Sequence, residues 1–290
     1  MASQVGSQGL PTNTGGAATT AAVANYMAAR GWNSQDLVPT NTSTTGAGYT
    51  TYTDSNNGSV VTVVGDTFAK GVFKIKDLNV GKTDEVLIGT GQNTEVRGTS
   101  EGNVVTIIDD ANHLVKLGAG DDVITNLGSG GGTFKGGEGS DTMIGGSGPE
   151  TMYGGAGSDA LYGGDGNDTL YGGGGADVLS GGAGDDHLVG GAGKDILTGG
   201  AGNDVLTGGT GADTFVFGAE QTGQDIITDF HKGDTLNLAA KQGAGITFTI
   251  SQQGPNTVVI FNDGSGDQIT LANVNASDLQ DPDGDGLFTL

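Results

Sequence analysis

The sequence predicts an all-β protein whose central region folds as a right-handed parallel β-solenoid. Residues 136–216 consist of nine consecutive nonapeptides without an insertion, each of the form G-G-x-G-x-D-x-U-x, where U is a large apolar residue. Glycine supplies 59 of the 290 residues, and cysteine is absent. A unit of nine residues is long enough for one short strand and one turn, so successive units must stack to bury their apolar side chains.

Each nonapeptide divides into a six-residue turn and the strand x-U-x. Because side chains alternate along a strand, U points to one face and its two neighbours point to the other. Two repeats then make one coil, with the U residues buried between two parallel sheets. Glycine supplies the positive φ and the close backbone approach that such a turn needs. The U residues are Met143, Met152, Leu161, Leu170, Leu179, Leu188, Leu197, Leu206 and Phe215.

The acid at the sixth position recurs at the same point of nearly every turn, so like charges stack along each edge of the solenoid. Such a stack is repulsive without a counter-ion. Ca²⁺ prefers carboxylate and backbone carbonyl oxygens, and glycine turns expose carbonyls. The pattern therefore predicts Ca²⁺ between successive turns of one edge. The alternative, a glycine-rich disordered linker with scattered acids, leaves the phasing of Asp and U unexplained.

Alternate repeats share an edge, which sorts the candidate ligands into two sets. The first edge carries Asp122, Asp141, Asp159, Asp177, Asp195 and Asp213. The second edge carries Glu150, Asp168, Asp186, Asp204 and Asp225. Glu150 follows Pro149 and is one methylene longer than Asp, so we expect a weak or altered site there. One coil earlier Gly132 stands where the acid belongs, and Asn126 is a one-residue insertion.

The formal net charge of −23 limits the possible partners. An acidic chain is unsuited to nucleic acid and to anionic membrane surfaces. About eight Ca²⁺ ions would reduce the charge to about −7. Apolar area is scarce and glycine loses much entropy on folding, so we expect a largely unfolded apo state and Ca²⁺-driven folding. The sequence has no apolar run long enough for a transmembrane helix.

The N-terminal part lacks the repeat. Residues 1–58 are expected to be flexible, with one alanine-rich helix at 17–30 that could cap the solenoid or dock a partner. Residues 59–116 are expected to be β-rich, with degenerate coils from about residue 84 that depend on packing more than on metal. There Asp or Asn recurs every nine or ten residues, usually with an apolar residue two places later. The polar series is Asp84, Asn93, Asn103, Asn112 and Asp122, followed by Val86, Val105, Leu114 and Ile124.

The C-terminal part continues the pattern and then changes it. We expect the regular calcium-binding roll to span residues 117–225. Residues 226–290 alternate like antiparallel strands and predict a β cap. The stretch from Asp281 to Gly286 is similar to the first half of an EF-hand loop but lacks the Glu of position twelve. A weak Ca²⁺ site and a set of solvated acids are both compatible with it.

The nonapeptide resembles the repeat of the RTX (repeats-in-toxin, hemolysin-type calcium-binding) family. This resemblance implies a β-roll with Ca²⁺ in its turns and an extracellular, secreted protein that can be associated with the cell surface. It also implies export by the type I pathway, with the secretion signal in residues 226–290. The N-terminus lacks the basic and apolar regions of a Sec signal peptide, in agreement with that route.

Motifs for catalysis are weak. Residues 98–102 match G-x-S-x-G, but a strand pattern follows Ser100 where a nucleophile elbow needs a helix. The histidines, His113, His187 and His231, do not form H-E-x-x-H. We therefore expect no enzyme activity.

The leading functional prediction is a structural calcium-binding protein that self-assembles as a surface layer, fibre, extracellular matrix or adhesin. One alternative is a calcium-dependent carbohydrate-binding module acting on a cell-surface glycan. Another is a secreted effector or enzyme accessory. Tyr153, Tyr162 and Tyr171 should point outward, either as a partner or glycan surface or beneath flanking segments.

Overall fold

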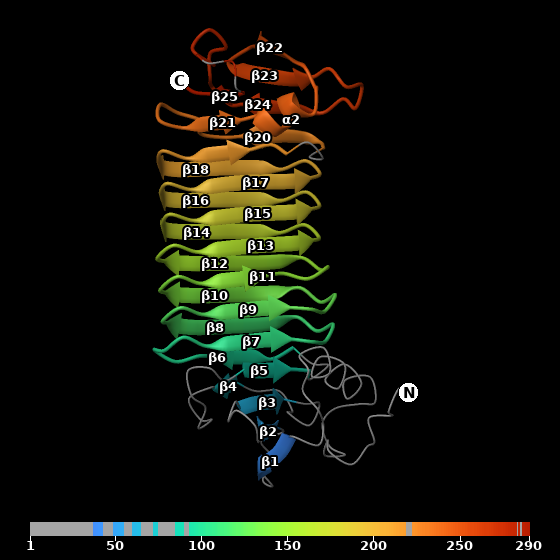
Figure 1. The fold of residues 1–290 in the computed structure, drawn as a ribbon, viewed down its shortest axis with the longest axis vertical. Coiled ribbons are helices and arrows are strands. Elements are labelled where there is room, and N and C mark those ends of the chain that lie inside the picture. Colours follow the sequence, from blue (N-terminus) through green and yellow to red (C-terminus); the bar gives the residue numbers. More distant parts are fainter. Residues whose placement is uncertain are drawn as a thin grey trace.

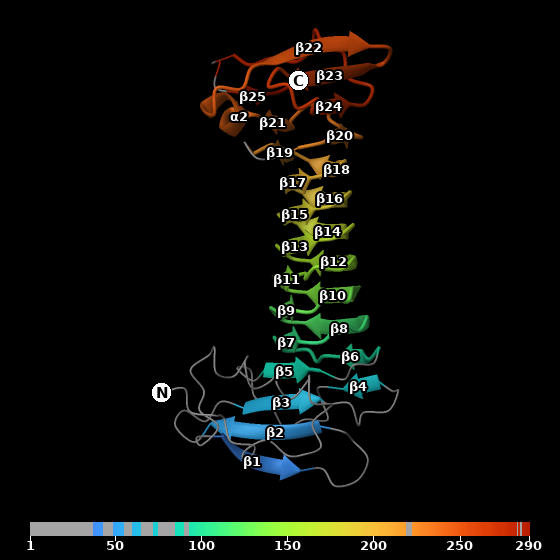
Figure 2. The same ribbon diagram turned by 90° about the vertical axis from the view of Figure 1, so that its right-hand side faces the viewer.

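A computed structural model describes residues 37–42, 49–54, 60–64, 72–74, 85–89, 93–218, 222–282, 284 and 286–290. Within these residues the strands stack along one axis as a parallel β-solenoid (Figure 1), and a perpendicular view shows two sheets back to back (Figure 2). The predicted fold class is therefore confirmed. The helix expected at 17–30 and Asp84, the first residue of the polar series, lie outside the described residues. None of the described helices is long and apolar enough to cross a membrane.

One sheet, here called sheet A, has thirteen strands among the described residues. Its order along the axis is β1 (Leu37–Thr42), β2 (Tyr49–Asp54), β3 (Val60–Val64), β5 (Glu85–Ile88), β7 (Val104–Ile107), β9 (Val123–Asn126), β11 (Thr142–Ile144), β13 (Ala160–Asp165), β15 (Val178–Ala183), β17 (Ile196–Ala201), β19 (Thr214–Val216), β21 (Thr235–Asn237) and β25 (Leu287–Phe288). From β3 to β21 all neighbours are parallel, and antiparallel pairs occur only at the two ends of this sheet.

The opposite sheet, sheet B, has twelve strands in the same part of the chain. Its order is β4 (Val72–Lys74), β6 (Glu95–Arg97), β8 (His113–Ala119), β10 (Gly132–Glu138), β12 (Glu150–Ala156), β14 (Thr169–Gly175), β16 (His187–Gly193), β18 (Val205–Gly211), β20 (Gln224–Ile227), β24 (Gln268–Leu271), β23 (Asn256–Phe261) and β22 (Phe248–Gln253). From β3 to β21 odd and even strands therefore alternate between the sheets, as two repeats per coil require.

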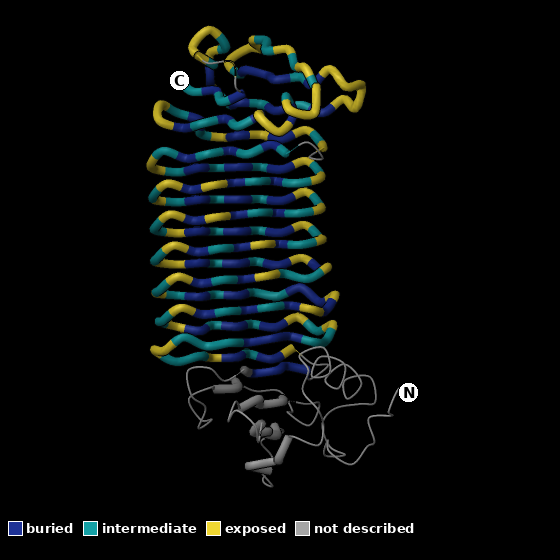
Figure 3. The backbone as a smooth tube through the Cα atoms, viewed as in Figure 1, coloured by how far each residue is buried: buried dark blue, intermediate teal, exposed yellow. Residues whose placement is uncertain are grey.

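The U residues form the core. All nine, from Met143 to Phe215, are at most 1 % exposed and lie in one column between the sheets. Burying such a side chain stabilises the fold by about 1.5–3 kcal/mol. Figure 3 shows the result: buried positions occupy the middle of each coil, and exposed positions gather at the turns. The core is only one side chain thick, so each coil depends on its neighbours.

The degenerate coils are present, but part of their predicted register is wrong. Val96 is the buried residue of β6. In β8 Val115 is buried together with His113 and Leu117, and Leu114 is half-buried on the outer side of the strand. His113, not Asn112, pairs with Gly132 and therefore occupies the position that the acid holds in the regular repeat, here called the rung position. The cause is an extra residue in the turns before β8 and β10, which lengthens these coils to 19 residues against 18 in the regular roll.

The C-terminal cap combines β22, β23 and β24 as an antiparallel sheet, as predicted. β24 then joins β20 in parallel, so the cap continues sheet B of the solenoid. A short helix not expected from the sequence, α2 (Ala239–Gly243), packs beside it. Phe248 contacts Phe261 and Phe288 with ring centroids 6.4 and 5.5 Å apart, which ties the cap strands to the chain end.

Candidate metal centre

The acids of the first edge form a continuous ladder. The backbone N–H of each acid donates to Oδ1 of the acid in the next coil, over 2.8 to 2.9 Å from Asp122 to Asp213. The ladder begins at Asn103, whose N–H donates to Asp122 over 2.6 Å. It ends at Asp234, which accepts from Asp213 over 3.0 Å. Asp234 was not predicted from the sequence, although Asp234-Thr235-Leu236 repeats the D-x-U of the nonapeptide.

The second edge has the same construction over a shorter span. The N–H of Glu150 donates to Asp168 over 2.7 Å, and the chain of bonds continues through Asp186 and Asp204 to Asp225. The predicted grouping of acids by edge is thus what the structure shows. Beyond Asp225 the N–H of Gly223 donates to Asp267, the residue before β24, over 3.0 Å. Asp267 was not predicted, because it follows 42 residues after Asp225 and lies outside the repeat.

The second carboxylate oxygen of these acids has no partner within the protein. Oδ2 is buried and accepts no hydrogen bond in Asp122, Asp141, Asp159, Asp168, Asp177, Asp186, Asp195, Asp204 and Asp213. A buried polar atom without a partner is costly, and a buried charged one more so. The regular arrangement of these atoms indicates that each one faces a ligand that the polypeptide does not provide.

Because the first glycine of each repeat has no side chain, it leaves a small space, here called the cradle, beside the Oδ2 atom of the same repeat. A Cβ on Gly181 would collide with Oδ2 of Asp186 and lie 2.6 Å from the carbonyl oxygen of Gly199 in the next coil. A Cβ on Gly190 would lie 2.5 Å from Oδ2 of Asp195 and 2.7 Å from the carbonyl oxygen of Gly208. The space therefore lies between a carboxylate and a carbonyl, the oxygen donors that Ca²⁺ takes.

The electrostatics of the ladders also fit a cation. Burial, together with the charges of Asp204 and Asp168 in the adjacent coils, raises the pKa of Asp186 to about 7. Burial likewise raises the pKa of Asp122 and Asp225 to about 7. A divalent cation in the cradle would favour the ionised form and reverse these shifts. No three His, Asp or Glu side chains of the described part converge on one point, so such a site must use backbone carbonyls as well.

The turn at Glu150 differs from the others, in line with the altered site expected there. Its Oε1 accepts from Nδ2 of Asn126 over 3.1 Å, and its Oε2 accepts from the N–H of Gly146 over 3.3 Å. Asn126, the inserted residue, also donates to the carbonyl of Gly130 over 2.7 Å. Protein donors thus take both oxygens of Glu150, and Gly132 in the preceding coil contributes no side chain.

His113 occupies the rung position two coils before Glu150. Its Nε2 lies 2.7 Å from Oδ1 of Asp109, and its Nδ1 accepts from the N–H of Thr94 over 3.3 Å. The imidazole is buried, so it fills the interior of the turn. The N-terminal coils of the second edge are therefore closed by hydrogen bonds between protein groups.

Two further candidates from the sequence are Ser100 and the loop that begins at Asp281. Ser100 lies in the turn between β6 and β7, and the hollow of about 480 Å³ beside it is lined without histidine. Asp281 accepts from the N–H groups of Gly284 and Gly286, over 2.9 and 3.3 Å. Asp283 and Asp285 of that loop lie outside the described residues.

The comparisons agree with this geometry. Residues 127–161, 144–179, 153–188 and 180–215 match a family model described as the RTX calcium-binding nonapeptide repeat, in four copies. A search of the curated proteins finds no match to the chain. The matched residues include the regular cradles and also the altered turn at Glu150. The repeat, the parallel solenoid and the buried acid ladders together fit a calcium-binding β-roll of the RTX type over the matched residues.

Proposed function

We propose that the chain is a secreted, non-enzymatic structural protein that folds on Ca²⁺ outside the cell and then associates with further copies of itself. The unpartnered Oδ2 atoms support the first half of this proposal, because they make the fold costly until a cation occupies the cradles. Extracellular modules have low-affinity Ca²⁺ sites, which suit the millimolar Ca²⁺ concentration outside the cell. Export by the type I route follows from the family resemblance.

The proposed ligands are the carboxylates of the two ladders together with glycine carbonyls of the adjacent coil. About eight ions would occupy these cradles, one between successive rungs. Asp234 extends the first edge by one rung. Glu150 contributes least, because its oxygens already accept hydrogen bonds from the protein.

The outer face of sheet A carries the proposal of self-association. From β9 to β19 the two outward positions that flank the central apolar residue of each strand are uncharged, in a chain with a net charge of −23, and the exposed Asp165 lies at the end of β13, three positions beyond Tyr162. Ile144, Tyr162, Val178 and Ile196 are 41, 42, 37 and 43 % exposed on this face. The face comprises Val123, Thr125, Thr142, Ile144, Ala160, Tyr162, Val178, Ser180, Ile196, Thr198, Thr214 and Val216.

A second copy fits this face because both partners have the same strand spacing and neither presents a charge to be desolvated. Two such faces related by a twofold axis form an isologous contact. Exposed apolar residues in one contiguous patch are typical of interaction surfaces. Self-association requires calcium because the flat outer face of sheet A exists only after the roll has folded on Ca²⁺.

The test compares Ile196→Lys with Ile226→Lys. Both isoleucines are outward residues next to a ladder acid, 43 and 41 % exposed, but Ile226 lies on sheet B. We expect the natural sequence and Ile226→Lys to assemble in Ca²⁺ and disperse in EGTA, by light scattering and electron microscopy. Ile196→Lys should stay monomeric with unchanged circular dichroism. A folded but monomeric natural protein, or equal assembly of both variants, would refute the proposal.

A further inference from the structure

Sheet B carries a row of cationic residues on its outer face. Arg97 pairs with Lys116 and Lys116 pairs with Lys135, so the three occupy the same position of β6, β8 and β10. Lys74 of β4 pairs with Arg97 in the same register. The chain has only 11 Lys and Arg residues against 34 Asp and Glu. Four of the 11 therefore fall in a single cross-strand row.

This row is electrostatically unfavourable by itself. Adjacent strands lie about 4.8 Å apart, and like charges directly opposite each other destabilise a sheet. One carboxylate compensates in part: Glu95 lies 2.9 Å from Nε of Arg97 and 3.2 Å from Nζ of Lys116, and both hydrogen bonds lower its pKa. Arg97, Lys116 and Lys135 with Glu95 leave a surplus of two positive charges, three minus one. The Arg97 and Lys116 side chains remain 51 and 43 % exposed.

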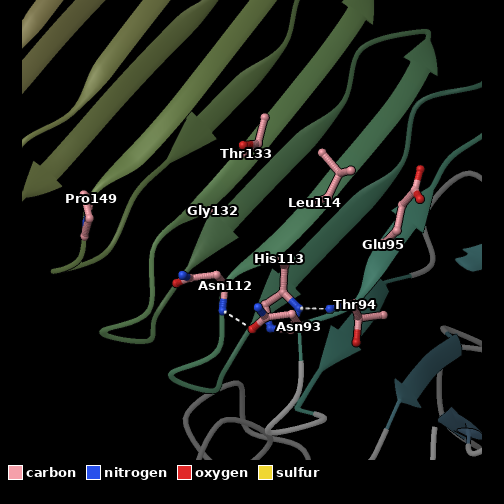
Figure 4. A pocket seen from close by; sticks show the side chains of 9 residues that line it. All are labelled: Asn93, Thr94, Glu95, Asn112, His113, Leu114, Gly132, Thr133 and Pro149. Atoms are coloured by element: carbon pink, nitrogen blue, oxygen red, sulfur yellow. Dashed lines mark hydrogen bonds between the residues drawn. The ribbon is translucent and has the colours of Figure 1, made fainter. Parts of the chain in front are cut away.

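A hollow of about 420 Å³ adjoins the row on the same face (Figure 4). Glu95, Leu114 and Thr133 line it, and each stands two positions before a cation of the row, so alternation places both sets on the outer side. Asn93 and Asn112 add amide groups from the turns. The hollow lies where the coils are lengthened, next to the irregular turns of the second edge. Cationic and neutral hydrogen-bonding groups thus lie side by side.

We propose that this surface, the cationic row with the adjoining hollow, binds a linear anionic polysaccharide. The acid groups of the polymer would contact Arg97, Lys116 and Lys135, since charge-assisted bonds to a guanidinium or ammonium are the strong ones. The sugar hydroxyls would contact Asn93, Asn112 and Thr133 in the hollow. A polymer with regularly repeated charges suits a row with regular strand spacing.

A protein partner fits this surface less well. The cores of protein interfaces are apolar and depleted in lysine. The large exposed apolar side chains of the described residues are Leu127, Ile144, Tyr162, Val178, Ile196 and Ile226, none of which belongs to the row or lines the hollow.

Single-stranded nucleic acid fits less well too, because it needs free aromatic faces on which bases stack. Other side chains cover the ring faces of the tyrosines that continue the row on β12 and β14. Nζ of Lys135 lies 4.3 Å from the ring centroid of Tyr153, and Tyr153 stacks on Tyr171 at 4.9 Å. His187 packs edge-on against Tyr171 on the far side, with centroids 6.3 Å apart.

The test measures retention on immobilised polygalacturonate, dextran sulfate and neutral dextran at a fixed, saturating Ca²⁺ concentration. The first two polymers separate carboxylate from sulfate recognition. We expect binding to at least one of them, none to dextran, and weakening by added NaCl. The double variant Lys116→Gln/Lys135→Gln should bind roughly tenfold more weakly. Lys194→Gln/Lys232→Gln has the same net charge and changes two exposed lysines outside the row, so it should bind normally.

Equal loss in both double variants would mean that net charge or Ca²⁺ bridging causes retention, and the proposal would fail. It also fails if dextran is retained, or if oligodeoxythymidylate binds more tightly than either acidic polymer. Circular dichroism with Ca²⁺ accompanies each variant, and Arg97→Gln replaces the double variant if that does not fold. The inference needs the calcium-loaded fold but not assembly through sheet A. The monomeric Ile196→Lys variant should still bind, which separates the two proposals.

Discussion

The ladder aspartates from Asp122 to Asp213 use their two carboxylate oxygens differently, whereas at Asp234 the Oδ2 atom accepts from the N–H of His231. Oδ1 accepts the N–H of the preceding coil, which fixes the side chain, and Oδ2 faces the cradle beside the first glycine. The glycines of the turn also have different tasks. Gly182 and Gly184 have φ values of 118° and 135°, which side chains rarely adopt, whereas Gly181 is needed for space. The turn is thus specified residue by residue.

Substitution of the first glycine should remove one calcium site. In Gly181→Ala the added methyl group would fill the cradle at Asp186, so we expect one Ca²⁺ fewer by calorimetry and a higher Ca²⁺ midpoint for folding. Gly174→Ala is the control, because a Cβ there meets nothing within 4 Å. It should keep every ion and change stability by about 1 kcal/mol or less. Equal ion numbers in the two variants would contradict the cradle assignment.

The residues that sequence analysis placed correctly are those with strict phasing. Asp122 and Asp225 could be assigned to their edges because D-x-U survives around them. Asp234 carried the same signal and was overlooked. His113 could not have been found from its type, since only the hydrogen bonds to Asp109 and Thr94 explain a buried imidazole at a rung position.

Among the elements, the turns before β10 and β12 show how the roll tolerates a defect. Asn126 donates to Glu150 and to the carbonyl of Gly130, so one amide group supplies the bonds that a cation would supply elsewhere. The N-terminal coils of the second edge can then remain closed without metal. The first edge, by contrast, is acidic at every coil from Asp122 to Asp234.

Neutralising Glu150 should therefore leave the number of bound Ca²⁺ ions unchanged. We expect Glu150→Gln to bind as many Ca²⁺ ions as the natural protein, because Asn126 and Gly146 already hold its oxygens. Asp168→Asn is the matched change one coil later and should lose an ion, since Oδ2 of Asp168 has no partner in the protein. Calorimetric titration of both variants decides the matter. Loss of an ion in Glu150→Gln would place a full site at this turn.

The register of the elements was predictable only where the period is constant. In the regular roll every strand follows from its neighbour by 18 residues, and the strands match the expected x-U-x positions. Leu114 was predicted as the buried residue of its coil in place of Val115, because the extra residue could lie on either side of the strand. The helix α2 was missed because Ala239–Gly243 is too short for a periodic signal, and tertiary packing decides its conformation.

For the whole molecule, a change of pH should have opposite effects on the stability of the apo fold and on folding driven by Ca²⁺. Burial raises the pKa of the ladder acids above the unfolded value of about 3.9, to about 6 in Asp159, Asp168 and Asp195 and to about 7 in Asp186. The apo fold then binds more protons than the unfolded chain, so its stability is greatest at acid pH and is lost as pH rises through 6 to 7. In EGTA we expect more β-sheet signal at pH 5 than at pH 8.

With Ca²⁺ the order should reverse, because protons compete for the same carboxylates. The Ca²⁺ concentration needed for half-folding should rise as the pH falls from 8 to 5. Circular dichroism along a calcium titration at each pH measures both effects. An apo signal that is constant, or higher at pH 8, would show that the acids are not buried without metal.

The rung-to-rung hydrogen bonds run along the solenoid axis and recur every 18 residues in the regular roll. Tension applied to the two ends therefore loads these contacts coil after coil. Each coil that peels away would release about 60 Å of extended chain. Since the ions cross-link neighbouring coils, external calcium would set the force at which peeling begins. The roll would then behave as an extensible tether whose stiffness follows the calcium concentration of its surroundings.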